Sequence, residues 1–275
     1  MKIITDLKEV QDWCERQTSI GFIPTMGCLH NGHLSLVNRA RQENDKVVVS
    51  IYVNPTQFLP GEDFDNYPRI PEDDCNLLRE ITDVVFLPND SVIYPMDRNA
   101  HQISEKNLSL KLCGANRPGH FDGVLLVVMK LLQLVRANRI YMGLKDFQQQ
   151  LLVSRMIRDF FLPTQLIPCP TVRESDGLAL SSRNKYLDRR ERALAPALYE
   201  TIRQFSEFSK QMGTQKAQTN LNSQLNKLGF DVDYLQILDE RNLEPICDLN
   251  SFSRIFVAAY LGKTRLIDNV GVTDV

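Results

Sequence analysis

The segment between residues 20 and 40 constrains the fold more than any other part of the chain. Residues 20–23 form a short apolar run that is typical of a buried strand, and apolar residues recur at helical spacing over residues 33–40. The turn between them contains Gly27 and Gly32, which permit sharp bends and a close approach of backbone to a ligand. This order predicts a strand–turn–helix unit, in which the unpaired N–H groups at the helix start can bind an anion.

Two histidines, His30 and His33, stand three residues apart in this turn, so we expect both imidazoles on one side of it. Together with the N–H groups they would hold a phosphate and stabilise negative charge that develops on it. Two alternatives stay open, namely unrelated surface histidines and one half of a metal site. The flanking strand and glycines favour the phosphate site.

Apolar strands alternate with amphipathic helices through the first 175 residues. The expected strands after the first are 46–53, 83–87, 139–142 and 164–168, and the expected helices are 6–17, 71–81, 123–136 and 147–161. Residues 102–112 are ambiguous and could form an edge strand. This alternation predicts an α/β domain with a mostly parallel sheet over residues 1–175.

The alternation ends near residue 175. Polar amphipathic helices are expected at 189–210 and 214–228, followed by short strands at 233–238, 254–261 and 266–270. Helices followed by strands predict a smaller α+β domain over residues 176–275. A junction of two domains is where a lid over a ligand site would lie.

Charge and cysteine usage restrict the class of partner and the compartment. The 275 residues include 32 Lys and Arg against 34 Asp and Glu, and a net charge of −2 argues against nucleic acid as the main partner. The six cysteines show no C-x-x-C spacing, which is typical of reduced thiols in a cytoplasmic protein. The N-terminus lacks the apolar core of a signal peptide and no apolar run reaches membrane-spanning length, so we expect no membrane partner.

Further ligand candidates come directly after expected strands. Asn54 and Gln57 offer neutral amides that can bind a hydroxyl, a carbonyl or a carboxylate, although an Asx-Pro turn explains this stretch equally well. Lys145 could meet a phosphate as a point charge. Asp146 could cap the next helix or bind a ribose hydroxyl or Mg²⁺, and Gln149 lies on the same face of that helix.

A glycine-containing loop joins the two expected domains. Ser181, Ser182 and Arg183 offer two hydroxyls and a cation to a phosphate, although a loop of this kind is also a common linker. His120 stands in a turn that leads into a buried helix, where a structural role and a role in the site are both open.

Taken together and in order, these residues resemble the pantothenate synthetase (pantoate–β-alanine ligase) family, which belongs to the HIGH-type nucleotidylyltransferases. The matching motifs are residues 24–27 with His30 and His33, then 54–58, 117–121, 145–149, 181–184 and 262–269. The resemblance covers nearly the whole chain. It implies a Rossmann-like N-terminal domain, a smaller C-terminal domain and a cytoplasmic homodimer.

The family's reaction, which the resemblance implies for this chain, has two steps. The pantoate carboxylate attacks the α-phosphate of ATP, giving pantoyl adenylate and pyrophosphate, and the β-alanine amine then attacks the acyl carbon, giving pantothenate and AMP. The family uses Mg²⁺ with the ATP. Neither step needs a covalent enzyme intermediate, so such an enzyme works by positioning reactants and stabilising charge on phosphorus.

The resemblance also implies roles for individual residues. The catalytic residues are His33, His30, Lys145 and Arg183. The ATP-binding residues are Met26, Gly27, Cys28, Leu29, His30, Asn31, Gly32, His33, Gly143, Leu144, Lys145, Asp146, Val172, Leu180, Ser181, Ser182 and Arg183. Gln57 and Gln149 hold pantoate, and Gln57 also approaches β-alanine; Asn54 is a further substrate-binding residue. Asp73 and Asp74 lie in a stretch that the family places near substrate or metal.

Two of these positions depart from the family's pattern, because most members have Glu at Leu144 and Met at Leu180. Three other functions stay open: a nucleotidylyltransferase that activates a phosphate ester, an aminoacyl-tRNA synthetase relative, and a nucleotide sensor. An aminoacyl-tRNA synthetase relative would need a basic surface to bind RNA, which a net charge of −2 does not favour. A sensor has no need of Gln57 and Gln149, so these glutamines favour the ligase.

Overall fold

The computed structural model describes residues 1–98 and 100–274, and the chain divides into two compact units. The N-terminal unit consists of Met1–Leu110, Gly114–Leu144 and Gln148–Pro170. The C-terminal unit consists of Lys111–Cys113, Lys145–Phe147 and Thr171–Val275. Within the described part of the chain, no helix is both long and apolar enough to cross a bilayer.

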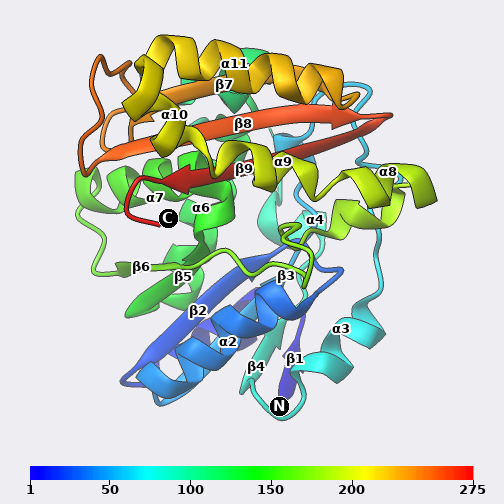
Figure 1. The fold of residues 1–275 in the computed structure, drawn as a ribbon. Helices are drawn as coiled ribbons and strands as arrows, with labels where there is room; N and C mark the ends of the chain where they lie inside the picture. The colour runs from blue at the N-terminus through cyan, green and yellow to red at the C-terminus, as the bar shows by residue number, and fades with distance from the viewer. Residues whose placement is uncertain (99, 275) are drawn as a thin grey trace. The chain divides into compact units, whose positions relative to one another are not determined.

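The N-terminal unit is built on a six-stranded parallel sheet in the order β1-β4-β3-β2-β5-β6 (Figure 1). Its strands are β1 (Lys2–Ile4), β2 (Ile20–Thr25), β3 (Lys46–Ile51), β4 (Val84–Phe86), β5 (Arg139–Gly143) and β6 (Gln165–Cys169). The predicted parallel α/β sheet is confirmed. The short edge strand β1 is an addition, because three residues are too few to show a periodicity.

The strand order changes direction at β2, which has β3 on one side and β5 on the other. β2 pairs with β3 along its whole length, whereas its described ladder with β5 has two pairs, Gly21 with Arg139 and Phe22 with Ile140. Open α/β sheets bind ligands beyond the carboxyl ends of their strands at such a switch point. The turn after β2 and the end of β5 therefore lie where a ligand is expected.

Helices cover both faces of this sheet, as its apolar strands require. They are α1 (Leu7–Cys14), α2 (Asn31–Glu43), α3 (Pro71–Leu78), α4 (Asp90–Ile93), α5 (Cys113–Asn116), α6 (His120–Val135) and α7 (Phe147–Asp159), with 3₁₀ turns η1 (Pro55–Gln57), η2 (Leu108–Leu110) and η3 (Leu144–Asp146). Figure 1 shows α2 lying across β2, and one core joins Leu36 of α2 and Leu78 of α3 to Val49 of β3. The predicted edge strand at 102–112 is wrong, since this segment contains η2 instead.

The C-terminal unit holds a three-stranded antiparallel sheet of β7 (Asp231–Asp239), β8 (Ser253–Leu261) and β9 (Thr264–Gly271). Its helices are α8 (Arg189–Leu194), α9 (Ala197–Ile202), α10 (Phe205–Met212) and α11 (Thr214–Lys227), with η4 at Ser182–Tyr186. The single helix predicted at 189–210 is wrong. It is broken first at Pro196, whose ring removes the N–H that a continuous helix would need there.

The short segment Lys145–Phe147 belongs to the C-terminal unit although it precedes that unit's main part by more than twenty residues. The Phe147 ring lies 5.5 Å from the ring of Phe256 in β8, centroid to centroid, and the Arg254 guanidinium lies 4.6 Å above it. The Asn269 side chain of β9 donates to the Lys145 carbonyl at 3.1 Å. The sheet of the C-terminal unit thus holds the Lys145 carbonyl directly and packs against Phe147, two residues further along the chain.

Candidate functional site

The turn after β2 has a left-handed backbone at two successive residues. Gly27 has φ of 81° and Cys28 has φ of 50°, a conformation that a side chain on Cys28 disfavours. The Gly27 N–H donates to the Thr25 hydroxyl at 3.2 Å, and that hydroxyl donates to the Ser50 carbonyl at 2.8 Å. Hydrogen bonds to residues at the ends of β2 and β3 therefore hold the turn in place.

Asp74 of α3 holds the next part of the turn. Its carboxylate oxygens accept the N–H groups of Cys28 at 2.9 Å and Leu29 at 2.7 Å, and its side chain is fully buried. Asp73 is exposed beside it. Among the described residues no group of three or more His, Cys, Asp or Glu could hold a metal ion. Asp74 thus holds the backbone of the turn through both of its carboxylate oxygens.

His30 and His33 close the start of α2. His30 Nδ1 accepts the Gly32 N–H at 3.2 Å and His33 Nδ1 accepts the His30 N–H at 3.3 Å, and the two rings lie 4.1 Å apart between centroids. A backbone N–H can only donate, so both Nδ1 atoms are acceptors and a neutral ring carries its hydrogen on Nε2. Each neutral ring then has a single N–H donor, at Nε2, and both rings stand at a helix N-terminus, which is suited to an anion.

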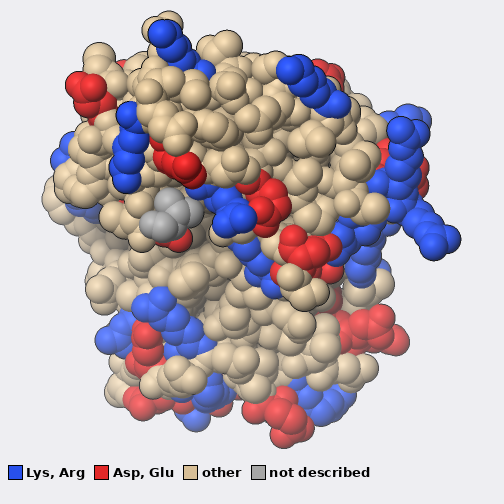
Figure 2. Space-filling view, in the orientation of Figure 1, with Lys and Arg blue, Asp and Glu red and all other residues tan. Residues whose placement is uncertain are grey.

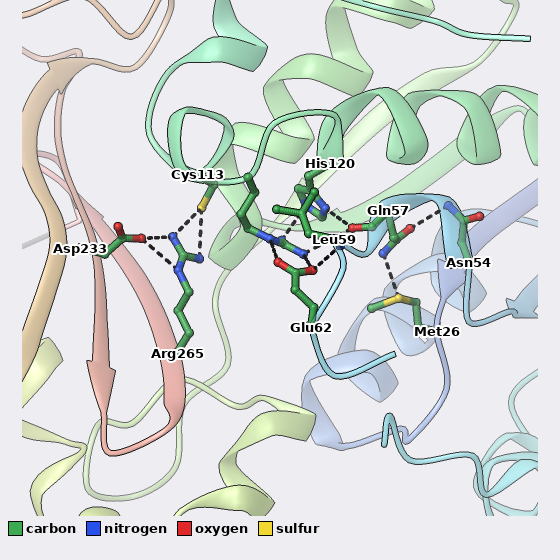
Figure 3. Close-up of polar contacts among 10 residues, drawn as sticks. Met26, Asn54, Gln57, Leu59, Glu62, Cys113, His120, Asp233 and Arg265 are labelled. Carbon is green, nitrogen blue, oxygen red and sulfur yellow. Dashed lines mark hydrogen bonds and ion pairs between the residues drawn. The ribbon is translucent and has the colours of Figure 1, made fainter. Parts of the chain in front are cut away.

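The amides of Asn54 and Gln57 lie against the same turn (Figure 3). Asn54 is fully buried and donates through Nδ2 to Gln57 Oε1 at 3.1 Å and to the Gly123 carbonyl at 3.1 Å. Gln57 Nε2 lies 2.9 Å from Met26 Sδ. The structure therefore brings a proposed substrate amide into contact with the turn proposed for ATP.

His120 joins this group from the first residue of α6. Its Nδ1 lies 2.7 Å from the Gln57 carbonyl oxygen, and its Nε2 lies 3.0 Å from Arg117 Nη1. Arg117 also forms a two-point ion pair with Glu62, with both N–O distances at 2.6 Å. Burial opposes ionisation of Glu62, but Arg117 and the Leu59 amide outweigh it and lower the pKa of this carboxyl.

The residues after β5 are divided between the two units. Gly143, Leu144 and Gln149 belong to the N-terminal unit, whereas Lys145 and Asp146 belong to the C-terminal unit. Asp146 is exposed at the end of η3, and its carboxylate lies 3.9 Å from Lys145 Nζ.

The remaining candidates form a loop within the C-terminal unit. The Leu180 N–H donates to the Val172 carbonyl at 3.0 Å, which places these two residues side by side. Ser181 caps η4 by accepting the Arg183 N–H at 3.3 Å, and Ser182 is buried behind it. Basic side chains gather over α8 in Figure 2, where the sequence of this helix supplies three arginines.

A comparison of the sequence with known protein families shows to which family this chain belongs. The model of the family described as pantoate-beta-alanine ligase matches residues 2–271. The chain belongs to the pantoate–β-alanine ligase family.

Relatives and solved structures of this family match along nearly their full length. The pantothenate synthetase of Thermotoga neapolitana is 47% identical over 98% of this chain and 99% of its own, and that of Acinetobacter baumannii is 46% identical over 92% and 90%. The Thermus thermophilus enzyme superimposes with a TM-score of 0.94 at 43% identity, covering 98% of this chain and 99% of that one. The Francisella tularensis ligase, solved with beta-gamma ATP and beta-alanine, has a TM-score of 0.83 at 40% identity, covering 98% and 97%.

Two residues of this ligase site are not among the sequence candidates. Glu62 lies in the loop after η1, and nothing in the sequence distinguishes it from a carboxylate at the protein surface. Gly123 lies on α6 against η1, where an added Cβ would stand 2.3 Å from the Thr56 carbonyl oxygen and 2.7 Å from the Gln57 nitrogen. A glycine near the start of an otherwise apolar helix was the available signal, because its cost to the helix points to a packing reason.

Proposed function

We infer that this chain catalyses the ATP-dependent condensation of pantoate with β-alanine to pantothenate. The observation that carries this conclusion is the match to the pantoate-beta-alanine ligase family over residues 2–271. The Francisella ligase, solved with beta-gamma ATP and beta-alanine, supports the same two substrates for this chain.

We propose that the reaction passes through pantoyl adenylate, with release of pyrophosphate and then AMP. In this scheme the N–H groups at the start of α2 and the Nε2–H groups of His30 and His33 stabilise the charge that develops on the α-phosphate. Gln57 and Gln149, with Asn54, hold pantoate without adding a competing charge. Lys145 and Arg183 supply cations to the phosphates, and residues 26–33, 143–146, 172 and 180–183 bind ATP.

The intermediate can be tested with pantoate labelled with ¹⁸O in its carboxylate. The attack of this carboxylate on the α-phosphate forms a new O–P bond, and the later attack of the amine breaks the C–O bond. One label is therefore expected in AMP, and pyrophosphate release should require pantoate but not β-alanine. Label found in pantothenate alone would refute the adenylate. Pyrophosphate released only with a phosphate ester would favour the other nucleotidylyltransferase class.

We propose a cytoplasmic homodimer that takes ATP with Mg²⁺ and has neither nucleic acid nor membrane as a partner, on the strength of the resemblance. Asp73 and Asp74 remain the residues proposed near substrate or metal, and no step is assigned to a metal held by this chain.

A further inference from the structure

The loop that follows η1 returns to the start of α6 and is tied there by charge. Gly61 has φ of 86°, and a turn from Leu59 to Glu62 brings the Glu62 carboxylate back to the Leu59 N–H at 3.1 Å. The same carboxylate binds Arg117 Nε and Nη2, each at 2.6 Å. A planar guanidinium that binds a carboxylate at two points has a fixed orientation, which aims Nη1 at His120.

The contacts of His120 define one tautomer. Arg117 can only donate, so His120 Nε2 is the acceptor of their 3.0 Å contact. The Gln57 carbonyl can only accept, so His120 Nδ1 is the donor of their 2.7 Å contact. A neutral imidazole with its hydrogen on Nδ1 satisfies both contacts at once. The series of contacts from Glu62 through Arg117 and His120 therefore ends in a donor held on the Gln57 carbonyl; Glu62, His120 and Gln57 are labelled in Figure 3.

The Gln57 side chain is held from other directions by its neighbours. Asn54 Nδ2 donates to the Gln57 Oε1, and Met26 Sδ contacts the Gln57 Nε2. Because Gly123 has no side chain, η1 can pack directly against α6. His120 and Gln57 are both buried, at 8% and 9% exposed, so bulk water cannot readily replace a lost partner. The position of this amide is thus fixed in part by groups that have no contact of their own with its side chain.

We propose that Glu62, Arg117 and His120 form a positioning unit that sets the affinity of the enzyme for the substrate held by Gln57. This role rests on the proposed function, in which that substrate is pantoate. A purely structural network would change the stability of the protein, or weaken the binding of ATP and pantoate to the same extent. A positioning unit changes the KM for pantoate selectively and acts only through Gln57.

The test measures the KM values for ATP and pantoate with His120→Ala, after wild-type enzyme has been shown to make pantothenate. We expect the KM for pantoate to rise roughly tenfold or more, as when a buried hydrogen-bond partner is left unmatched, and the KM for ATP to change by less than about twofold. His120→Asn places an amide Nδ2 near the position of Nδ1, so it should restore most of the affinity. Wild-type enzyme without pantoate-dependent activity would refute the proposed function itself.

A double-mutant cycle shows whether His120 acts through Gln57. In a Gln57→Ala background, His120→Ala should cause no further rise in the KM for pantoate, because the group that it positions is already gone. Equal rises in both backgrounds would overturn the proposal, and so would parallel rises for ATP and pantoate.

A matched control separates positioning from general loss of stability. Arg41→Gln removes another arginine–carboxylate pair of the N-terminal unit, with Asp83 at 2.6 Å, and should lower the unfolding midpoint without changing the KM for pantoate. If His120→Ala does not fold, Glu62→Gln decides the question, because it keeps the shape of the side chain and removes its charge. A normal KM for pantoate in a folded Glu62→Gln enzyme would then overturn the proposal.

Discussion

His30 and His33 use their Nδ1 atoms to close the first turn of α2, and we propose that their Nε2–H groups serve the phosphate. His33→Ala removes both the cap and the donor, and His33→Asn keeps an acceptor near Nδ1 but removes the donor. We expect kcat to fall roughly 100-fold or more in both variants, since in the proposed scheme the lost donor stabilises the charge that develops on the α-phosphate. Single-turnover kinetics would check this. Near-normal turnover in His33→Asn would show that the histidine is a cap and nothing more.

Asp74 gives a second test at a single residue. Asp74→Asn keeps the size of the side chain but turns an amide NH₂ toward one of the N–H groups of Cys28 and Leu29. A buried donor without an acceptor costs about 1–3 kcal/mol, so the free energy of unfolding in urea should fall by that amount. The control, Asp73→Asn, changes an exposed neighbour and should stay within about 0.5 kcal/mol of wild type. A larger effect of Asp73→Asn on activity would favour the metal role after all.

The sequence predicts where ligand groups stand along the chain better than it predicts what holds them. Asn54, Gln57 and the histidines follow strands in sequence, and strand ends are the expected ligand edge of such a sheet. The pairing of Asp74 with Cys28 and Leu29 spans about 45 residues, and no local periodicity indicates a contact at that distance. The same applies to Glu62, whose partner Arg117 is 55 residues away.

At the level of elements, the contact between η1 and α6 depends on Gly123. An alanine there would place Cβ 2.3 Å from the Thr56 carbonyl oxygen, so the backbone of η1 or of α6 must move. We expect Gly123→Ala to destabilise the protein by about 1–3 kcal/mol through overpacking and to raise the KM for pantoate. Thermal unfolding and initial rates provide the two measurements.

A cavity in the same helix is the control for Gly123. Leu132→Ala removes a buried side chain nearer the other end of α6 and should cost about 2–5 kcal/mol of stability. Since it leaves η1 in place, the KM for pantoate should not change. Equal KM changes in the two variants would mean that loss of stability, and not displacement of Gln57, affects the substrate.

Some helices and strands of this fold can be predicted from local sequence patterns and others cannot. Strands β2, β3 and β5 are predicted closely because their apolar runs are continuous and end at polar or turn residues. The helix predicted at 189–210 keeps its apolar period through α8, α9 and α10, and that period outweighed Pro196 in the prediction. The order of strands in the sheet has no local signal, because pairing joins residues far apart in the chain.

For the molecule as a whole, burial of the cysteines predicts its reaction with thiol reagents. Five of the six cysteines are buried and Cys247 is exposed. Burial raises the pKa of Cys14 to about 12 and raises the pKa values of Cys75 and Cys169, so little thiolate forms at these positions near neutral pH. A native sample should show one fast-reacting thiol in a dithionitrobenzoate assay, and Cys247→Ser should remove it. Fast reaction at Cys28 instead would reveal opening of the turn after β2.

The C-terminal unit takes three of its residues, Lys145–Phe147, from the middle of the chain. On the ribosome these residues emerge long before their partners, since Phe256 is added about 110 residues after Phe147. At a synthesis rate of roughly 5–20 residues per second, Phe147 waits about 5–20 s for the strand that covers its ring. Asn269, which holds the Lys145 carbonyl, comes later still. The nascent chain therefore fixes the Lys145 carbonyl only after Asn269 has been added.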